Sequence, residues 1–481
     1  PSANLGEGQE DGLTVNVGIK NIKRKKAYVN FNTSFSYTDG YRTNSQTSET
    51  DDAIGNQLNS SSSNTFNTLK SFTSLSDIST GIKNLGKKDR SLSFNAGYDI
   101  RFDTGNRTEN TRAITSNFQE IKNLTYDIDN DYVSCYGRLA YVEPFGNRWK
   151  LRLSFIGNYL SRTDSQDAFS PEGVADDYYS SQTDNRYLKG EGQLLMQYKN
   201  DTTDVQFGLS CEVFKNETVS KSLGTVSETG KGDWQVDLAP FLNYRYNAGK
   251  NNFSLYYSGN GRQVQSSSLK PVLDITNPVI LRTGNIYLKP SFSHFLNLAY
   301  SFNNREKFTF FRIYGYANLS SRGEVEASWF DDSGIRYSVP VNAKKPSLSI
   351  SLNPTFNRVF GETKHFSITL YGSASYNSTT SYQAASRLPG LDTESFNYYD
   401  FIAGFYGNSK GDKFYSGDSG FSQSRSTTLR WSASASLKYS IDKLDLSIGM
   451  SAANAVSRYS LNKSSNLSTW DFKPTFNAMY Q

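Results

Sequence analysis

The sequence has very few of the residues that most often form metal and catalytic centres. Its 481 residues include only two cysteines, two histidines and three methionines. Neither His294 nor His365 has a second histidine or a cysteine at a ligand spacing, so a zinc site is not indicated. Cys135 and Cys211 fall in segments predicted to lie three strands apart, about 14 Å at the usual strand spacing, which excludes a disulfide. We expect no metal, no cofactor and no enzymatic activity.

Long apolar runs and a large excess of one charge are also missing. No segment approaches the roughly 18 consecutive apolar residues of a membrane-spanning helix, so helical spanning is excluded. The net charge is only +5, from 51 basic and 46 acidic residues. Two basic clusters, at 23–26 and 87–90, fall in predicted turns, and we interpret them as solvated charge rather than as an anion site. Nothing indicates a nucleic-acid partner.

What the sequence does contain is a two-residue alternation of apolar and polar side chains along most of its length. In the clearest run the polar residues are Ser, Asn, Gly, Asp and Arg, and the apolar residues between them are Leu92, Phe94, Ala96, Tyr98 and Ile100. The same period occurs at 347–352 and at 429–439. This alternation predicts β-strands that have one apolar and one polar face. It is weakest at 11–20 and 68–84.

The overall composition agrees with such strands only if the apolar face meets lipid. The chain is 36% hydrophobic and 14% aromatic, yet its mean hydropathy is −0.59. These values conflict in a soluble globule, but they agree in a barrel whose strands face hydrocarbon on one side and water on the other. Tryptophan and tyrosine also gather at strand ends, as interfacial belts require. We therefore predict an all-β fold, a transmembrane antiparallel β-barrel that crosses the outer membrane of a Gram-negative bacterium many times.

Short and long connections alternate between the predicted strands. The short turns, which we assign to the periplasmic side, fall near 21–26, 85–89, 143–148, 200–203, 247–251, 303–306, 359–364 and 441–442. The long connections, which we expect to be extracellular loops, run near 39–67, 103–130, 161–184, 216–232, 264–290, 320–344, 378–427 and 456–467. Short turns on one side and long loops on the other are typical of outer-membrane barrels.

The predicted strands number about seventeen, whereas single-chain bacterial barrels have an even number. The last predicted strand, at 470–480, stops where a short turn should follow. Pro240 and Pro354 each precede a short turn by six or seven residues, and Pro474 precedes the chain end by seven. Because proline cannot donate to a ladder, we expect bulges or edge-adjacent positions there. We expect residues 1–481 to be one barrel domain, excised from a larger barrel.

The predicted long loops are rich in aromatic residues. Flat rings in exposed loops can stack on a ligand or a partner protein, and they can equally pack against one another as a cap. Both interpretations stay open for the ten residues of this set, which are Tyr178, Tyr179, Phe396, Tyr398, Tyr399, Phe401, Phe405, Tyr406, Phe414 and Tyr415.

One segment carries a more specific pattern. It contains Ser268-Leu269-Lys270-Pro271-Val272-Leu273-Asp274, then Asn277-Pro278, Gly284-Asn285 and Leu288-Lys289-Pro290, ahead of a strand at 296–301. Glycine, asparagine and proline suit a long external loop that must turn tightly before it re-enters the sheet. The segment resembles the mid-barrel signature of TonB-dependent receptors, and in particular the outer-membrane β-barrel family common in Bacteroidetes. It departs from that pattern at Ile286-Tyr287 and Ser291.

This resemblance implies a barrel of 22 strands with a plugged lumen, energised through TonB. A plug and a TonB-binding segment are not recognisable in the sequence, so we expect a fragment that lacks the N-terminal plug and the C-terminal strands, or a plugless member. The resemblance gives a structural role to seven residues: Asn277, Pro278, Gly284, Asn285, Leu288, Lys289 and Pro290. The expected surroundings are outer-membrane lipid and lipopolysaccharide, and the expected proteins are TonB and surface lipoproteins.

Three functions remain open from the sequence. The first is a TonB-dependent uptake receptor that captures a nutrient with its extracellular loops. The second is a plugless structural or assembly barrel, which would serve as a docking platform for surface lipoproteins or an envelope complex. The third is a soluble all-β lectin or adhesin, which would bury its Trp, Phe and Leu residues between two stacked sheets. The strand count and the Gly-Asn and Leu-Lys-Pro pattern favour the first.

Overall fold

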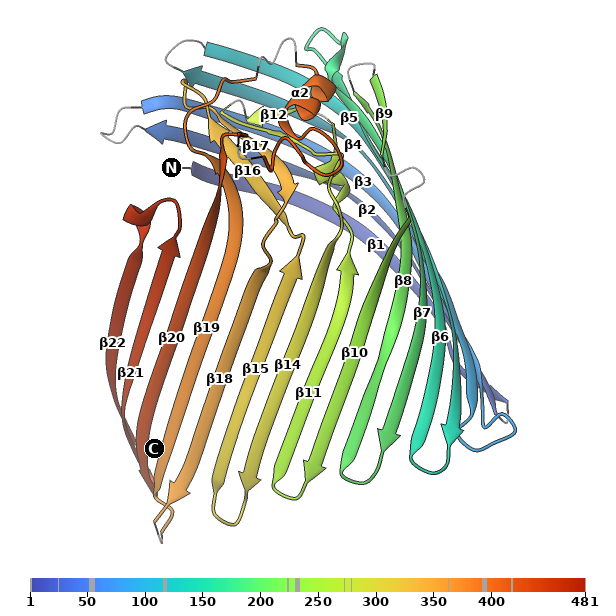
Figure 1. Ribbon diagram of the computed structural model, residues 1–481, viewed down its shortest axis with the longest axis vertical. Helices are drawn as coiled ribbons and strands as arrows, with labels where there is room; N and C mark the ends of the chain where they lie inside the picture. Colours follow the sequence, from blue (N-terminus) through green and yellow to red (C-terminus); the bar gives the residue numbers. More distant parts are fainter. Residues whose placement is uncertain are drawn as a thin grey trace.

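The protein is nearly all β in the computed structural model, and it forms a tall, strongly curved sheet (Figure 1). The structure describes residues 2–24, 26–51, 57–115, 119–222, 225–229, 234–271, 273–277, 279–361, 363–391, 396–416 and 418–480. Within these ranges 22 strands belong to one sheet. None of the helices described there is both long enough and apolar enough to cross a bilayer.

Seventeen of the described strands form a wall in which each strand pairs antiparallel with the next one along it. This matches the predicted number. The wall strands are β1 (Ser2–Arg24), β2 (Ala27–Asp51), β3 (Gln57–Lys83), β4 (Ser91–Thr115), β5 (Gln119–Phe145), β6 (Trp149–Phe169), β7 (Ala175–Lys199), β8 (Thr203–Ser222), β10 (Trp234–Ala248), β11 (Asn251–Arg262), β14 (Ser291–Asn304), β15 (Thr309–Ser321), β18 (Ser347–Phe360), β19 (Phe366–Ala384), β20 (Phe421–Ile441), β21 (Leu444–Tyr459) and β22 (Leu467–Tyr480).

The remaining elements are short and lie near the end of the wall that is uppermost in Figure 1. Strand β9 (Thr225–Thr229) extends the hairpin that β8 begins. The others are α1 (Ser266–Leu269), β12 (Leu273–Asn277), β13 (Ile280–Thr283), β16 (Glu324–Phe330), β17 (Arg336–Asn342), α2 (Tyr398–Phe405) and the 3-10 helix η1 (Lys463–Ser465).

The two-residue alternation places apolar side chains on one face of the wall. In β4, Phe94 is 43% exposed, and its register partner in β5 is Leu139, which is 44% exposed. Leu139 in turn pairs with Phe155 of β6, which is 64% exposed. Apolar side chains that stay this exposed over neighbouring strands require a lipid environment. They are not buried between two stacked sheets, so the soluble alternative is wrong.

The short turns lie where they were predicted, at the edge of the wall that is lowest in Figure 1. The predicted long loops are only partly loops. The connections at 39–67, 103–130 and 161–184 are mostly strand, because β2 to β7 continue well beyond the membrane. An antiparallel ladder satisfies backbone groups whatever the side chains are, and no proline interrupts the first two of these segments. The weakly alternating segments 11–20 and 68–84 are also strand.

The three prolines occupy positions where pairing is incomplete on one side. Pro240 pairs with β8, whereas the ladder between β10 and β11 begins one residue later. The β18–β19 ladder omits Pro354. Pro474 lies in β22, which among the described strands pairs only with β21. These placements match the edge-adjacent positions predicted for them, because a missing N–H costs nothing on an unpaired side. Among the same strands, β1 pairs only with β2.

Cys135 and Cys211 lie in β5 and β8, which are three places apart in the wall, and both are exposed and free. This confirms the spacing predicted from the alternation. Each cysteine shares the apolar face of its strand, since Cys135 is paired with Tyr159 and Cys211 with Leu238. They act as small apolar side chains on the lipid-facing surface.

Candidate functional site

The segments between β11 and β20 contribute a small sheet inside the mouth of the wall. Strand β13 pairs parallel with β17, and β17 forms a hairpin with β16. Strand β16 then pairs parallel with the upper end of β19, so the small sheet is bonded directly to the wall. We call α1, β12, β13, β16, β17 and α2 the insert. Figure 1 shows it lying across the space that the curved wall encloses.

The insert has its own hydrophobic core, centred on Trp329 of β16. Its indole stacks on Tyr337 with ring centroids 5.2 Å apart and is flanked by Phe401 and Phe405 of α2. The buried residues of this core are Leu273, Leu281, Ala327, Trp329, Ile335, Tyr337, Val339, Val341, Tyr382, Phe396, Tyr398, Ile402, Tyr406 and Phe414. Because so many rings pack together, the insert forms a rigid boundary for any site beside it.

Most of the ten aromatic loop residues, for which ligand or partner contact and mutual packing both stayed open, belong to this core. Phe396, Tyr398, Tyr406 and Phe414 are buried in it, and Tyr399, Phe401, Phe405 and Tyr415 pack against it. Their rings therefore pack against one another. Tyr179 lies elsewhere, at the upper end of β7, and packs against Leu124, Tyr126 and Ala168. The side chain of Tyr178 lies outside the described residues.

The signature residues hold the insert together. A Cβ atom on Gly284 would lie 2.3 Å from the carbonyl oxygen of Lys270, so only glycine fits there. The Asn285 side chain is fully buried and donates to the carbonyl of Pro340 at 3.0 Å. The Lys289 N–H donates to the side chain of Asn342 at 2.8 Å.

The structure also describes most of the other signature residues. Leu288 and Pro290 are buried, and Asn277 is the last residue of β12, while Pro278 lies outside the described residues. The contacts join the loop before β14 to β17.

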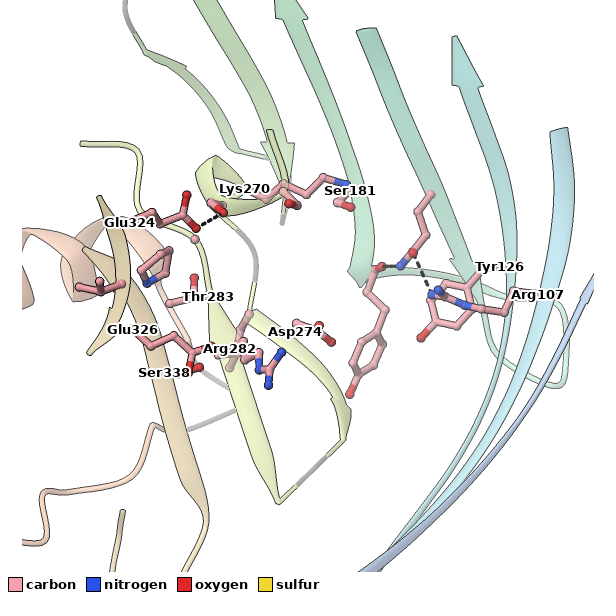
Figure 2. A pocket seen from close by; sticks show the side chains of 18 residues that line it. Arg107, Tyr126, Ser181, Lys270, Asp274, Arg282, Thr283, Glu324, Glu326 and Ser338 are labelled. Carbon is pink, nitrogen blue, oxygen red and sulfur yellow. Dashed lines mark hydrogen bonds between the residues drawn. The ribbon is translucent and has the colours of Figure 1, made fainter. Parts of the chain in front are cut away.

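A cavity of about 520 Å³ lies between the insert and the upper parts of β4 to β7 (Figure 2). The wall lines one side of the cavity with Arg107, Tyr126, Gln166, Tyr179 and Ser181. The insert lines the other side with Ser267, Ser268, Lys270, Leu273, Asp274, Arg282, Thr283, Gly284, Glu324, Val325, Glu326, Ser338 and Pro340. The cavity is therefore enclosed by charged and hydroxyl-bearing side chains from two separate parts of the fold.

The wall side of the cavity is basic and held by hydrogen bonds. Arg107 of β4 and Tyr126 of β5 are register partners, and the guanidinium lies 4.2 Å from the centre of the phenol ring. Arg107 also donates to the side-chain oxygen of Gln166 at 2.8 Å, and Gln166 donates to the carbonyl of Tyr179 at 3.1 Å. Burial raises the pKa of Tyr126 well above its usual value, so this phenol is a neutral donor and acceptor.

The insert side combines acidic groups with one half-buried lysine, Lys270. Glu324 accepts a hydrogen bond from Ser268 at 2.5 Å, and Glu326 forms an ion pair with Arg336 at 3.0 Å. Burial lowers the pKa of the Lys270 ammonium, because the charged form is poorly solvated there.

Two polar groups that line the cavity lack a direct hydrogen bond or salt bridge to the described residues. The Thr283 hydroxyl has no hydrogen-bond partner, although its residue is only 5% exposed. No described carboxylate forms a salt bridge with Lys270 either. A buried polar group without a partner costs free energy, so the Thr283 hydroxyl would gain from a polar ligand, and the half-buried Lys270 ammonium would gain from an anionic group. The described residues hold no cluster of His, Cys, Asp and Glu that would suit a metal ion.

The sequence pattern did not reveal most of this cavity. Arg107 and Tyr126 lie at 103–130, which was predicted to be a loop, and their partners across the cavity are more than 140 residues away in the chain. Lys270 and Asp274 are part of the quoted signature segment but were given no role. One signal in the sequence could have indicated them. In this segment the charged residues alternate with apolar residues, such as Leu273, that are buried in the structure.

A lipid-facing β-wall with short turns on one side defines a multi-pass β-barrel protein of the bacterial outer membrane. The chain belongs to the outer membrane protein beta-barrel family, whose sequence model matches residues 83–480. This confirms the predicted fold class and location. A comparison with curated proteins gives no match.

Several solved structures are similar to this chain. The hemophore receptor HasR of Serratia marcescens, solved with its hemophore HasA and heme, has a TM-score of 0.40 at 8% identity, covering 98% of this chain and 80% of that one. The alcaligin receptor FauA of Bordetella pertussis has 0.34 at 10% identity, covering 98% and 75%. The ferric yersiniabactin uptake receptor FyuA of Yersinia pestis has 0.34 at 9% identity, covering 99% and 80%.

Proposed function

We propose that this protein is an outer-membrane receptor that binds a polar nutrient in the cavity and passes it through the lumen. The observation that carries the proposal is the position of the cavity, between the wall and an insert that lies across the mouth of the lumen. Thr283 and Lys270 both line this space, and the Thr283 hydroxyl has no hydrogen-bond partner among the described residues. A binding site needs polar groups that a rigid structure holds in position before the ligand arrives.

The energy source and the plug are further parts of this proposal. The resemblance of the signature segment to TonB-dependent receptors supports coupling to TonB. In that case a plug, supplied from outside residues 1–481, would occupy the lumen beneath the insert. Closure of the wall into 22 strands belongs to the same proposal. The platform for lipoproteins, which was the second function considered, has no specific observation in its favour.

Uptake by living cells tests this function directly. Cells that lack the gene would be compared with cells that carry it, on defined media whose limiting nutrient is an oligosaccharide, a peptide or a ferric siderophore. We expect one nutrient class to require both the protein and TonB, and we expect Lys270→Ala with Thr283→Ala to reduce its uptake at least tenfold. Normal uptake of every nutrient without the protein, together with lipoproteins that copurify with it, would support the platform instead.

A further inference from the structure

The turn end of the wall carries a concentration of positive charge that the proposed function does not use. The eight short turns, each taken with four residues on either side, contain 21 of the 51 basic residues but only 8 of the 46 acidic ones. Their net charge is therefore +13, while the rest of the chain carries −8, which together give the overall +5. Solvated turns alone do not explain such a separation, because the equally solvated opposite end has the opposite sign.

Part of this charge connects neighbouring turns. The Lys26 ammonium donates to the carbonyl of Asn84 at 3.3 Å, which joins the first turn to the second. Lys150 pairs with Asp89 at 3.3 Å and joins the third turn to the second. These contacts join the first three turns of the row that all eight form at this end of the wall, and we call the whole row the basic rim.

Other cations of the basic rim do not connect neighbouring turns. Lys88, Arg148 and Lys443 are exposed, and none of the described side chains forms a salt bridge or hydrogen bond with their charged groups. They occupy three different turns of the row. An exposed cation with no protein partner is available to an anion outside the protein.

The basic rim lies at the depth of the lipid headgroups. Trp149, the first residue of β6, shares the lipid-facing side of that strand with Phe155 and is itself 40% exposed. Its ring lies 4.9 Å from that of Tyr198, so the two form part of an interfacial aromatic belt. Arg148 and Lys150 flank Trp149 directly. The rim cations therefore stand just outside the hydrocarbon layer, on the periplasmic side.

We propose that the basic rim binds the phosphate headgroups of anionic phospholipids in the inner leaflet of the outer membrane. Basic residues beside a membrane attract anionic lipid by about 1 kcal/mol each, which corresponds to about fivefold in local enrichment. The rim would thereby fix the depth of the barrel and surround its periplasmic end with anionic lipid. This binding depends only on the membrane location and not on the proposed uptake.

Tryptophan quenching by brominated lipids tests the proposal. Trp149 is kept as the only tryptophan, and the protein is reconstituted in vesicles of phosphatidylcholine with brominated phosphatidylglycerol or brominated phosphatidylcholine. We expect the phosphatidylglycerol to quench Trp149 as though it were enriched about fivefold, and we expect high salt to weaken the preference. A variant that keeps only Trp234, at the other end of the lipid-facing surface, should show no preference.

Charge-neutral variants separate lipid binding from folding. Lys88→Gln with Arg148→Gln removes two unpaired cations near Trp149 and should bring the preference close to onefold. Lys443→Gln, on a distant turn, is the matched control and should leave it unchanged. Circular dichroism and resistance of the folded barrel to detergent confirm that each variant is intact. Equal quenching by both lipids in the parent protein would overturn the proposal, and so would a preference that survives the double substitution.

Discussion

The hydroxyl of Tyr398 donates a hydrogen bond to the carbonyl oxygen of Gly284 at 3.2 Å, across 114 residues of sequence. The same hydroxyl accepts the N–H of Ile286 at 3.1 Å. Helix α2 is thus attached to the signature segment through one buried phenol, whose pKa burial raises above its usual value. Because that segment also lines the cavity, this contact couples the aromatic core to the candidate binding site.

Removing this hydroxyl should loosen the insert. Tyr398→Phe leaves a buried N–H and a buried carbonyl without their partner, which costs about 1–3 kcal/mol of local stability. We expect faster amide exchange at 284–286, measured by hydrogen exchange with mass spectrometry. Tyr399→Phe is the matched control, because the neighbouring ring lies at the edge of the same core. Equal exchange in the two variants would contradict this account.

Adding one methyl group at Gly284 should disrupt the signature turn. The new Cβ would meet both the carbonyl oxygen and the amide nitrogen of Lys270, at 2.3 and 2.7 Å. Since backbone atoms cannot move aside easily, we expect Gly284→Ala to destabilise the insert by about 1–3 kcal/mol.

The control for this substitution is in α2. A Cβ on Gly404 meets nothing within 4 Å, and alanine favours helix over glycine by about 1 kcal/mol. Gly404→Ala should therefore be neutral or stabilising. Protease sensitivity of the insert measures both variants, and a Gly284→Ala protein as resistant as the parent would refute the steric argument.

The half-buried Lys270 predicts a particular pH dependence of stability. Its pKa is lower in the folded protein than in the unfolded chain, so over the interval between the two values the unfolded chain binds more protons. Stability should therefore rise with pH through the folded pKa and level off near 10.5, the value of an unperturbed lysine.

Substitution isolates this contribution. Lys270→Met should remove the rise, whereas Lys289→Met, at an exposed position of the same segment, should keep it. Protease resistance of the insert, measured as a function of pH, follows both. If the stability of the insert in the parent protein fell as the pH rose over that interval, this explanation would be contradicted.

Arginine substitutions should distinguish the two faces of β6. Phe155 faces lipid, whereas Asn158 lies on the opposite face of the strand by the two-residue period. Arginine deep in the lipid-facing band costs about 2–4 kcal/mol, while lumen positions tolerate charge. We expect Phe155→Arg to lower the yield and the refolding midpoint in lipid vesicles, and Asn158→Arg to change neither by much. The opposite order would place the faces the other way round.

The sequence by itself determined the wall. A strand needs only its own two-residue alternation to specify which side chains face lipid, and a tight turn needs only a few local residues. The number of wall strands, the short turns and the separation of Cys135 from Cys211 were therefore readable directly. Where alternation faded among Ser, Thr and Asn, as at 39–67, the sequence indicated loops, although the ladder of the backbone continued there.

Only the tertiary structure decided the cavity and the insert. Alternation specifies the face of a side chain but not its partner across the lumen, so nothing local could place Arg107 and Glu324 on opposite sides of one space. The same limit applies to the rings at 396–415, since a ring that stacks on a ligand and one that packs on Trp329 have identical sequence signals. Partners far apart in the chain are chosen by packing and by the satisfaction of buried polar groups.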